Sequence, residues 1–240
     1  MNNTTRPETT LFMIESLDGK ISTGDNDELD VDKDFKRIVG VKEGLQQYYE
    51  LEQKTDWYSL NTGRVMAKIG LNQRTEEPKK IGVNFIIIDN KPHLTDKGVA
   101  YLAKWVKTLY LVTTNKNHPA FSLQARYPGI KIIFYQNHID FIDLFKKFKQ
   151  EYSIERITIQ SGGTLNAHLL RLKLIDHISV IIAPCLIGGR DTQSLIGGTS
   201  IHTQQDLIHI KALKLVKCDV LKNSYIHLQY DILNTTKIEE

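Results

Sequence analysis

The sequence predicts an α/β protein in which a mostly parallel, mixed central sheet is covered by helices on both faces. Short apolar runs alternate with amphipathic segments along residues 9–183, and the links between them are short. This alternation is typical of parallel strands joined by crossover helices. After Pro184 the pattern changes to two strand-like runs, 210–220 and 225–233, which we expect to form an antiparallel hairpin at the sheet edge.

The N-terminal part of the chain begins with an expected strand at 9–14, where apolar residues dominate. The pair Asp18 and Gly19 then marks a turn, and an acidic, glycine-containing loop follows over 23–32. Apolar side chains recur at helical spacing after this loop, so the sequence predicts a single helix over 34–53.

The middle of the chain alternates further strands and helices. Apolar runs bounded by turn-forming residues predict strands over 57–60, 84–89, 108–113, 130–135, 155–159 and 178–182. Helical patterns predict helices over 95–105, 119–127, 139–152 and 163–174. The polar stretches at 61–68 and 73–80 are interpreted as loops.

Composition limits the class of function. The chain has 240 residues, 41% hydrophobic and 25% charged, which suits one domain over 1–240 with frayed ends at 1–8 and 234–240. The net charge of +3 is too small to indicate a nucleic-acid partner, and no apolar run approaches the roughly 20 residues that span a bilayer. Because Cys185 and Cys218 are far apart and the histidines form no metal-binding pattern, we expect a cytoplasmic protein without a metal site.

Two glycine pairs suggest where a ligand binds. Gly162 and Gly163 separate an expected strand from an expected helix, and Gly188 and Gly189 follow the next strand. The first N–H groups of a helix have no partner within it and favour an anion, and glycine lets a phosphate approach the main chain. The junctions suggest a nucleotide-cofactor groove, although two tight turns would give the same pattern. The chain matches neither the G-x-G-x-x-G nor the P-loop motif.

Six segments, in order along the chain, resemble the reductase domain of riboflavin biosynthesis. They are Ser-Leu-Asp-Gly-Lys-Ile at 16–21, Thr-Gly-Asp at 23–25, Ile-Ile-Ile-Asp at 86–89, Leu-Val-Thr-Thr at 111–114, Gly-Gly-Thr-Leu-Asn at 162–166 and Ala-Pro-Cys-Leu-Ile-Gly-Gly at 183–189. The resemblance covers almost the whole chain and implies a dihydrofolate-reductase-like, three-layer α/β/α fold. It also implies an NADPH-dependent reductase that converts the ribosyl group of a ribosylaminopyrimidine to ribityl.

The resemblance also implies which residues meet the cofactor. Residues from Glu15 to Lys20 would border the nicotinamide, with Asp18 and Lys20 as candidate catalytic residues. Asp18 equally suits an Asx turn that supports the next glycine, and Lys20 a solvated lysine. Thr113 and Thr114 would meet the adenosine ribose and its 2′-phosphate. The remaining cofactor residues that the resemblance implies are Gly63, Gly162, Gly163, Thr164, Leu165, Asn166, Gly188 and Gly189.

The substrate side departs from the family pattern at two positions. The family usually has a lysine where this chain has Phe12, and an acid where this chain has Ser161. Phe12 would make that wall apolar and available for stacking against a ring. The acidic run at 25–34 is largely explained by helix capping and the helix dipole. Further candidates for binding the substrate are Asp27, Arg64, Lys68 and Arg74.

Three functions remain open from the sequence. The first is an NADPH-dependent reductase of a pyrimidine- or pteridine-type molecule; the second is a related oxidoreductase with a different carbonyl or imine substrate. The third is a non-catalytic nucleotide-binding protein on the same scaffold. No deaminase domain is expected ahead of residue 1, so any activity would be that of a stand-alone reductase. The expected partners are a small molecule and a second copy, because the resemblance implies a homodimer and the hairpin offers an apolar edge.

Overall fold

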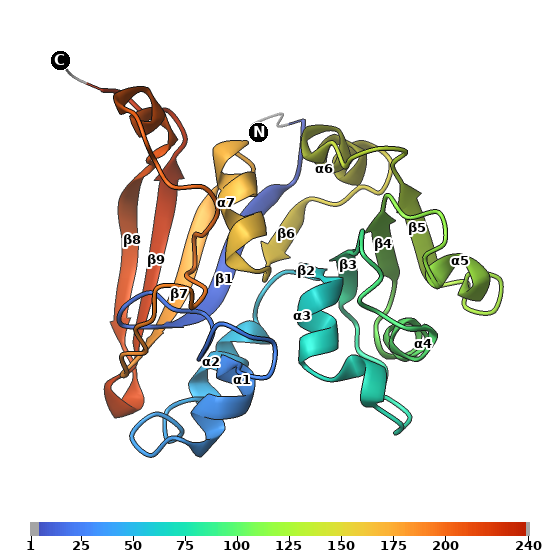
Figure 1. The fold of residues 1–240 in the computed structure, drawn as a ribbon, viewed down its shortest axis with the longest axis horizontal. Coiled ribbons are helices and arrows are strands. Elements are labelled where there is room, and N and C mark those ends of the chain that lie inside the picture. The colour runs from blue at the N-terminus through green and yellow to red at the C-terminus, as the bar shows by residue number, and fades with distance from the viewer. Residues whose placement is uncertain (1–4, 239–240) are drawn as a thin grey trace. The chain divides into compact units, whose positions relative to one another are not determined.

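The computed structural model describes residues 5–238, which divide into two compact units (Figure 1). Of the described residues, the first unit takes 5–7 and 56–161, and the second takes 8–55 and 162–238. Over this part of the chain, no helix is both long and apolar enough to cross a membrane. The prediction of a single domain stays a prediction, and the expected fraying at 1–4 and 239–240 lies outside the described residues.

The first unit is built on five parallel strands in the order β5-β4-β3-β2-β6. Their bounds are β2 (Tyr58–Thr62), β3 (Asn84–Ile88), β4 (Leu109–Thr113), β5 (Ile130–Phe134) and β6 (Arg156–Ile159). The helices of this unit are α3 (Gly63–Lys68), α4 (Asp96–Trp105), α5 (Ala120–Leu123) and α6 (Phe141–Gln150), with a 3-10 turn at Leu71–Gln73. The sequence predicted all of these strands and three of the four helices.

The core of the first unit follows from the sequence pattern. β4 is buried at every position, as expected for a parallel strand that is covered on both faces. The long helices present one apolar face and start at polar caps: Thr95 accepts a hydrogen bond from Gly98 N–H, and Asp140 accepts one from Asp143 N–H. Local capping and burial therefore agree with each other in this unit.

The second unit contains β1 (Glu8–Ser16), β7 (His177–Ala183), β9 (Ile226–Leu233) and β8 (Ala212–Val220), in that order. β1 and β7 are parallel, whereas β9 is antiparallel to both β7 and β8. The helices are α1 (Val31–Asp34), α2 (Gln46–Glu52) and α7 (Gly163–Arg171), with 3-10 turns at Phe35–Arg37, Gln204–His209 and Lys222–Ser224. The predicted C-terminal hairpin and the mixed α/β character are confirmed.

The predicted helix over 34–53 is wrong. The segment contains a 3-10 turn, a run of turns and then α2. Gly40 has a φ of +90°, which is incompatible with a right-handed helix. A Cβ on Gly44 would lie 2.4 Å from Tyr225 Cδ2, and the Tyr225 hydroxyl donates to Val41 O at 2.7 Å. Tertiary packing around Tyr225 therefore shapes this segment and overrides its helical pattern.

The interpretation of residues 61–68 as a loop is also wrong, because Gly63–Lys68 forms α3. Thr62 caps this helix: its Oγ1 accepts a hydrogen bond from Val65 N–H at 3.3 Å. A threonine followed by a short run of helix-compatible residues is the signal that could have identified it.

Candidate functional site

The start of α7 is the first element of the candidate site. Gly162 is the N-cap residue, and it has no side chain to satisfy the first turn. Among the described residues, none accepts a hydrogen bond from the N–H groups of Gly163 or Thr164. These N–H groups and the helix dipole favour an anion, so the residues present are suited to hold a phosphate.

The structure gives Gly163 a reason to be glycine that the sequence did not show. A Cβ on Gly163 would lie 2.1 Å from the carbonyl oxygen of Ser194 and 3.2 Å from the nitrogen of Gly197. The Gly197 N–H also donates to the Gly163 carbonyl at 3.0 Å. The close approach at this position is therefore made by protein main chain, whereas the sequence assigned it to a phosphate.

Residues 184–199 form a segment, here called the strap, that joins three of the sequence motifs within the second unit. The turn at 16–21 bonds to the strap through main-chain hydrogen bonds to Cys185 and Leu195, among others. Asn166, on α7, donates from its side-chain amide to the Leu195 carbonyl at 2.9 Å. Motifs that lie far apart in the sequence therefore meet at one loop.

The Asp18 carboxylate joins the turn at 16–21 to the strap by hydrogen bonds. Its Oδ1 accepts from Ser16 Oγ at 2.5 Å and from Ile187 N–H at 3.1 Å, and its Oδ2 accepts from Gly188 N–H at 2.6 Å. The Ser16 hydroxyl, aided by these main-chain donors, lowers the pKa of Asp18 to about 2. The carboxylate is therefore ionised near neutral pH and poorly suited to donate a proton, and its catalytic role stays a prediction.

Lys20 binds the strap, and the second glycine pair, Gly188 and Gly189, lies within it. The Lys20 ammonium donates to Thr192 O at 3.1 Å and to Ser194 Oγ at 3.4 Å, so this lysine is half-buried and bound rather than solvated. Gly188 and Gly189 are exposed and have φ values of +71° and +83°. Both φ values lie in the left-handed region that favours glycine, so glycine lets the strap turn next to the main-chain groups that Asp18 binds.

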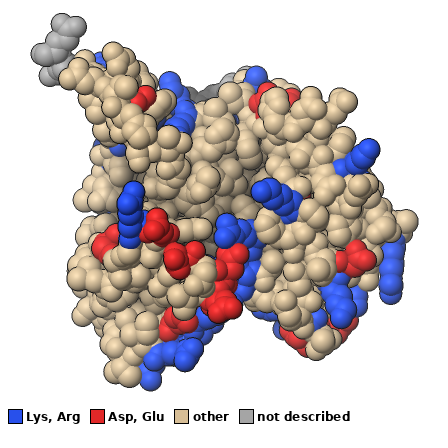
Figure 2. Space-filling model, viewed as in Figure 1, with Lys and Arg blue, Asp and Glu red and all other residues tan. Residues whose placement is uncertain are grey.

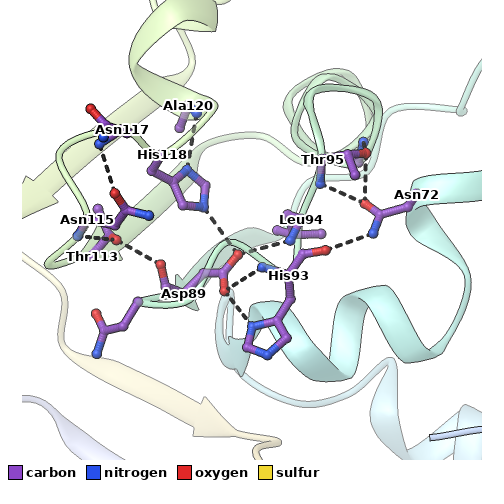
Figure 3. A network of polar contacts seen from close by, with 12 residues as sticks. Asn72, Asp89, His93, Leu94, Thr95, Thr113, Asn115, Asn117, His118 and Ala120 are labelled. Carbon is purple, nitrogen blue, oxygen red and sulfur yellow. Dashed lines mark hydrogen bonds and ion pairs between the residues drawn. The ribbon is translucent and has the colours of Figure 1, made fainter.

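In the first unit, two candidate residues, Gly63 and Thr113, lie against Asp89, the residue that follows β3; Figure 3 shows Thr113 and the other partners of Asp89. Its buried carboxylate contacts His93, Leu94 and His118. Burial raises the pKa of Asp89, but the hydrogen bonds from His118, His93 and the main chain outweigh it, so the pKa lies below its usual value. An ionised carboxylate therefore sits beneath the carboxyl ends of β3 and β4.

Gly63 packs against this carboxylate. A Cβ on Gly63 would lie 2.2 Å from Asp89 Cγ. The sequence interpreted Gly63 as a cofactor-loop glycine, and the structure shows that it lets the first turn of α3 approach Asp89.

Thr113 and Thr114 differ in what they offer to a ligand. The Thr113 side chain is fully buried, and its hydroxyl donates to Asp89 O at 2.7 Å and accepts from Asn115 N–H at 3.0 Å. Thr114 is half-exposed; its N–H donates to Asn90 Oδ1 at 3.0 Å, while no described residue bonds its hydroxyl. Thr114 is therefore the better placed of the two to contact a ligand.

The three candidate cations of the first unit have different surroundings. Arg64 is exposed and Lys68 is half-buried, both on α3. Arg74 donates to the Tyr101 hydroxyl at 3.1 Å and stacks over the Tyr101 and Trp105 rings at 5.3 and 5.9 Å. Arg74 is thus held against α4 by aromatic contacts.

The remaining candidates of the substrate side are dispersed. Phe12 is 2% exposed and stacks on Tyr48, with ring centroids 5.4 Å apart. Ser161 is buried, and Asp27 is exposed. Burial raises the pKa of Glu15 to about 7. Of these side chains, Phe12 belongs to the apolar core rather than to an exposed wall, and its place in a substrate site stays a prediction.

The acidic run mostly serves local structure. Asp30 caps α1 by accepting from Asp32 N–H, and Asp34 accepts from Asp30 N–H at 2.9 Å. Figure 2 shows acidic side chains gathered over α1 and the loop before it. No group of acidic, histidine or cysteine side chains suited to a metal ion occurs among residues 5–238.

Sequence reasoning missed several residues that hold the candidate residues in place within each unit. It quoted Asp89 only as the end of a strand motif and gave no role to His93, His118, Thr192 or Ser194. A buried aspartate at the end of a parallel strand was the available signal, because such a charge needs partners. The histidine and strap partners come from other loops, and no local pattern could have indicated them.

Comparison with known proteins identifies the family. The model of the RibD C-terminal domain matches residues 7–226. The chain belongs to this family. It is 24% identical over 209 residues to the 2,5-diamino-6-ribosylamino-4(3H)-pyrimidinone 5′-phosphate reductase of Methanothermobacter thermautotrophicus, covering 86% of this chain and 91% of the relative. It is 22% identical over 206 residues to the protein of the same name from Archaeoglobus fulgidus, covering 81% and 88%.

Solved structures of RibD C-terminal domain proteins share the fold. Acinetobacter baumannii RibD superposes with a TM-score of 0.67 at 17% identity, covering 95% of this chain and 59% of that chain. The riboflavin biosynthesis reductase Rib7 of Saccharomyces cerevisiae gives 0.58 at 20% identity, covering 97% and 92%. This chain therefore spans about three fifths of the Acinetobacter protein and nearly all of the yeast reductase. The α/β fold with its C-terminal antiparallel hairpin is that of RibD-type reductases.

Proposed function

We propose that this protein is a pyrimidine reductase of riboflavin biosynthesis, which transfers a hydride from NADPH to a ribosylaminopyrimidine 5′-phosphate. The observation that carries the proposal is the meeting of three family motifs on the strap, in a chain whose relatives of similar length are reductases. The arrangement supplies a helix start suited to an anion, as binding of a dinucleotide pyrophosphate requires.

Within the second unit, the N–H groups of Gly163 and Thr164 would bind the pyrophosphate. Leu165 and Asn166 lie in the same turn of α7, and Gly188 and Gly189 lie in the strap, to which Asn166 and Asp18 bond. The nicotinamide supplies the hydride when the cofactor is bound. The protein's part is to orient the reactants and exclude water.

The preference for NADPH over NADH rests on Thr114. Thr114 is half-exposed, and its hydroxyl makes no hydrogen bond to any described residue, whereas the Thr113 hydroxyl already donates to Asp89 O. A hydroxyl donor suits a 2′-phosphate, which accepts strong charge-assisted hydrogen bonds. Thr114→Val should therefore weaken NADPH binding more than NADH binding.

A related oxidoreductase with a different carbonyl or imine substrate is the second candidate, and Phe12 favours it. The family's lysine is replaced here by a side chain that is stacked on Tyr48 in the core. Phe12→Lys and Ser161→Glu would each introduce a charge at a buried position, because Phe12 is 2% exposed and Ser161 is 1% exposed. The panel of substrates described below therefore tests this candidate better than restoring the family residues would.

A homodimer through β8 is part of the proposal. β8 is an edge strand, and Leu213, Leu215, Val216 and Val220 on it are 43–83% exposed. An exposed apolar edge strand is a template for pairing with another chain, and a second copy would cover it. Light scattering at micromolar concentration should therefore give twice the mass of the chain, and Val216→Lys should give the monomer.

The experiment for the proposed function uses the purified protein. NADPH and NADH are titrated by nicotinamide fluorescence, and NADPH oxidation is then followed with the ribosylaminopyrimidine 5′-phosphate and with a panel of pteridines, carbonyls and imines. Turnover of the pyrimidine supports the riboflavin-pathway role, and turnover of another compound alone supports the second candidate. Cofactor binding without any turnover would indicate a nucleotide-binding protein, and the absence of cofactor binding would refute the proposal.

A further inference from the structure

The Asp89 carboxylate is a fully buried group of the first unit with hydrogen bonds to both of its oxygens. Its side chain is 0% exposed and accepts four hydrogen bonds. Oδ1 accepts from the main chain and from Nδ1 of His93, at 3.2 and 2.9 Å. Oδ2 accepts from Leu94 N–H and from His118 Nε2, both at 3.1 Å. Each oxygen thus has one main-chain donor and one histidine donor.

The two histidines are not equivalent. His93 has a side chain that is 38% exposed, whereas the side chain of His118 is 0% exposed. The Ala120 N–H donates to His118 Nδ1 at 3.1 Å, so Nδ1 is an acceptor and the ring carries its proton on Nε2. His118 is therefore a neutral imidazole in a fixed tautomer that joins Asp89 to the start of α5 (Figure 3).

This bridge fixes the main chain after β4. The His118 bond ties the loop at 114–119 to Asp89, and the Thr113 hydroxyl ties the end of β4 to the Asp89 carbonyl at 2.7 Å. Thr114 N–H is bound in turn by the side chain of Asn90 at 3.0 Å. Thr114, which is half-exposed, therefore lies on a backbone that is bonded to Asn90 at Thr114 itself and to Asp89 through Thr113 and His118.

We propose that Asp89 and His118 are positioning residues that hold Thr114 for the adenosine end of the nicotinamide dinucleotide. This inference rests on the proposed function. Neither side chain can reach a ligand, since both are fully buried, and they act through the backbone that carries Thr114.

Two variants of His118 separate its two bonds. His118→Gln places a side-chain amide donor near the position of Nε2, so the bond to Asp89 can be kept while the Ala120 bond is lost. His118→Asn places an amide oxygen near the position of Nδ1, so the Ala120 bond can be kept while the bond to Asp89 is lost. His93→Ala is the matched control, because the main-chain N–H of the same residue still donates to Oδ1.

The experiment measures the dissociation constant for NADPH by nicotinamide fluorescence, without substrate. We expect a rise of about tenfold or more for His118→Asn, which corresponds to about 1.4 kcal/mol. We expect changes within about threefold for His118→Gln and His93→Ala. If His118→Asn does not fold, Thr113→Val, which removes the other tie to Asp89, should produce the same rise. A folded His118→Asn or Thr113→Val protein with unchanged affinity overturns the positioning role and leaves the proposed function standing.

The tautomer has a readout of its own. In ¹⁵N-labelled wild-type protein, the His118 imidazole should show the pattern of a ring that carries its proton on Nε2 and accepts a hydrogen bond at Nδ1. A His118 ring that is protonated on Nδ1 overturns the bridge, whatever the cofactor titration gives. If the wild-type protein binds neither NADPH nor NADH, the proposed function fails, and the positioning role toward a cofactor fails with it.

Discussion

Replacing Gly163 by alanine should destabilise the protein, while the same change at Gly162 should not. A Cβ at 163 would meet the carbonyl of Ser194 at 2.1 Å, a main-chain atom that cannot rotate away. A Cβ at 162 would meet only the flexible Gln193 Oε1, at 3.5 Å. The φ of −72° at Gly162 also suits alanine.

The magnitudes follow from the two geometries. Forcing a methyl group into a packed contact costs roughly 1–3 kcal/mol, and each kcal/mol lowers the melting temperature of a chain of this size by about 2–4 °C. Gly162→Ala restricts the unfolded chain without a clash, so we expect a change between zero and a gain of about 1 kcal/mol.

The assay is urea denaturation of the two single variants beside the wild type, read by circular dichroism. NADPH affinity is measured on the same samples, because the strap holds the loop next to the start of α7. Equal stability of the two alanine variants would refute the argument that protein main chain, rather than a ligand, requires glycine at 163. In that case, the close approach of a phosphate, which the sequence suggested, would again be the better explanation for glycine at 163.

Three further predictions concern ionisable groups. The pH–rate profiles of Asp18→Asn and the wild type should show the same transitions between about pH 5 and 8, because a group with a pKa of about 2 is ionised throughout this range. A transition that is present in the wild type and absent in the variant would make Asp18 an acid or base of the reaction. Burial raises the pKa of Glu15 from 4.5 to about 7, so the free energy of unfolding should decrease as pH rises through this interval. Glu15→Gln should therefore be more stable than the wild type above pH 7 but not below pH 4.5. His177 bonds Glu8 and Asp231 at 2.8 Å each, and although burial opposes protonation, these carboxylates raise its pKa above 6.5. Its stabilisation should be complete below pH 6.5 and lost as pH rises through the raised value, so urea midpoints of wild type and His177→Gln should converge at high pH; a gap that widens with pH would contradict this sign.

Much of the fold could be predicted because its signals are local. Parallel strands such as β3 and β4 are continuous apolar runs, and helices such as α4 and α6 combine an apolar face with a capping residue. The segment at 34–53 failed because its shape depends on Tyr225, which lies far away in the sequence. Phe35, Leu45 and Tyr48 are buried, but Ile38 and Val39 are 42% and 79% exposed. The helical spacing therefore describes only part of the segment, and tertiary contacts set the backbone.

That the candidate residues bind a ligand stays a prediction, but the structure shows what the motif segments contact. The turn at 16–21 and the start of α7 both bond to the strap in the second unit, and the end of β4 bonds to Asp89 in the first. The motif patterns singled out all three segments. They could not show that Asp18 binds Ile187 and Gly188, or that Thr113 binds Asp89. Such bonds join loops that are separated by many residues, and the sequence carries no spacing that marks them.

These bonds also change what the polar residues of the site can do. The side chains of Asp18, Lys20, Thr113 and Asn166 are each engaged with protein groups. A side chain whose donors and acceptors are already bonded to protein groups has few free to bind a ligand. Ligand binding must therefore depend on other groups, including the N–H groups at the start of α7. It follows that substituting the motif side chains should lower stability and cofactor affinity together, and that a variant which changes affinity alone should be sought at Thr114.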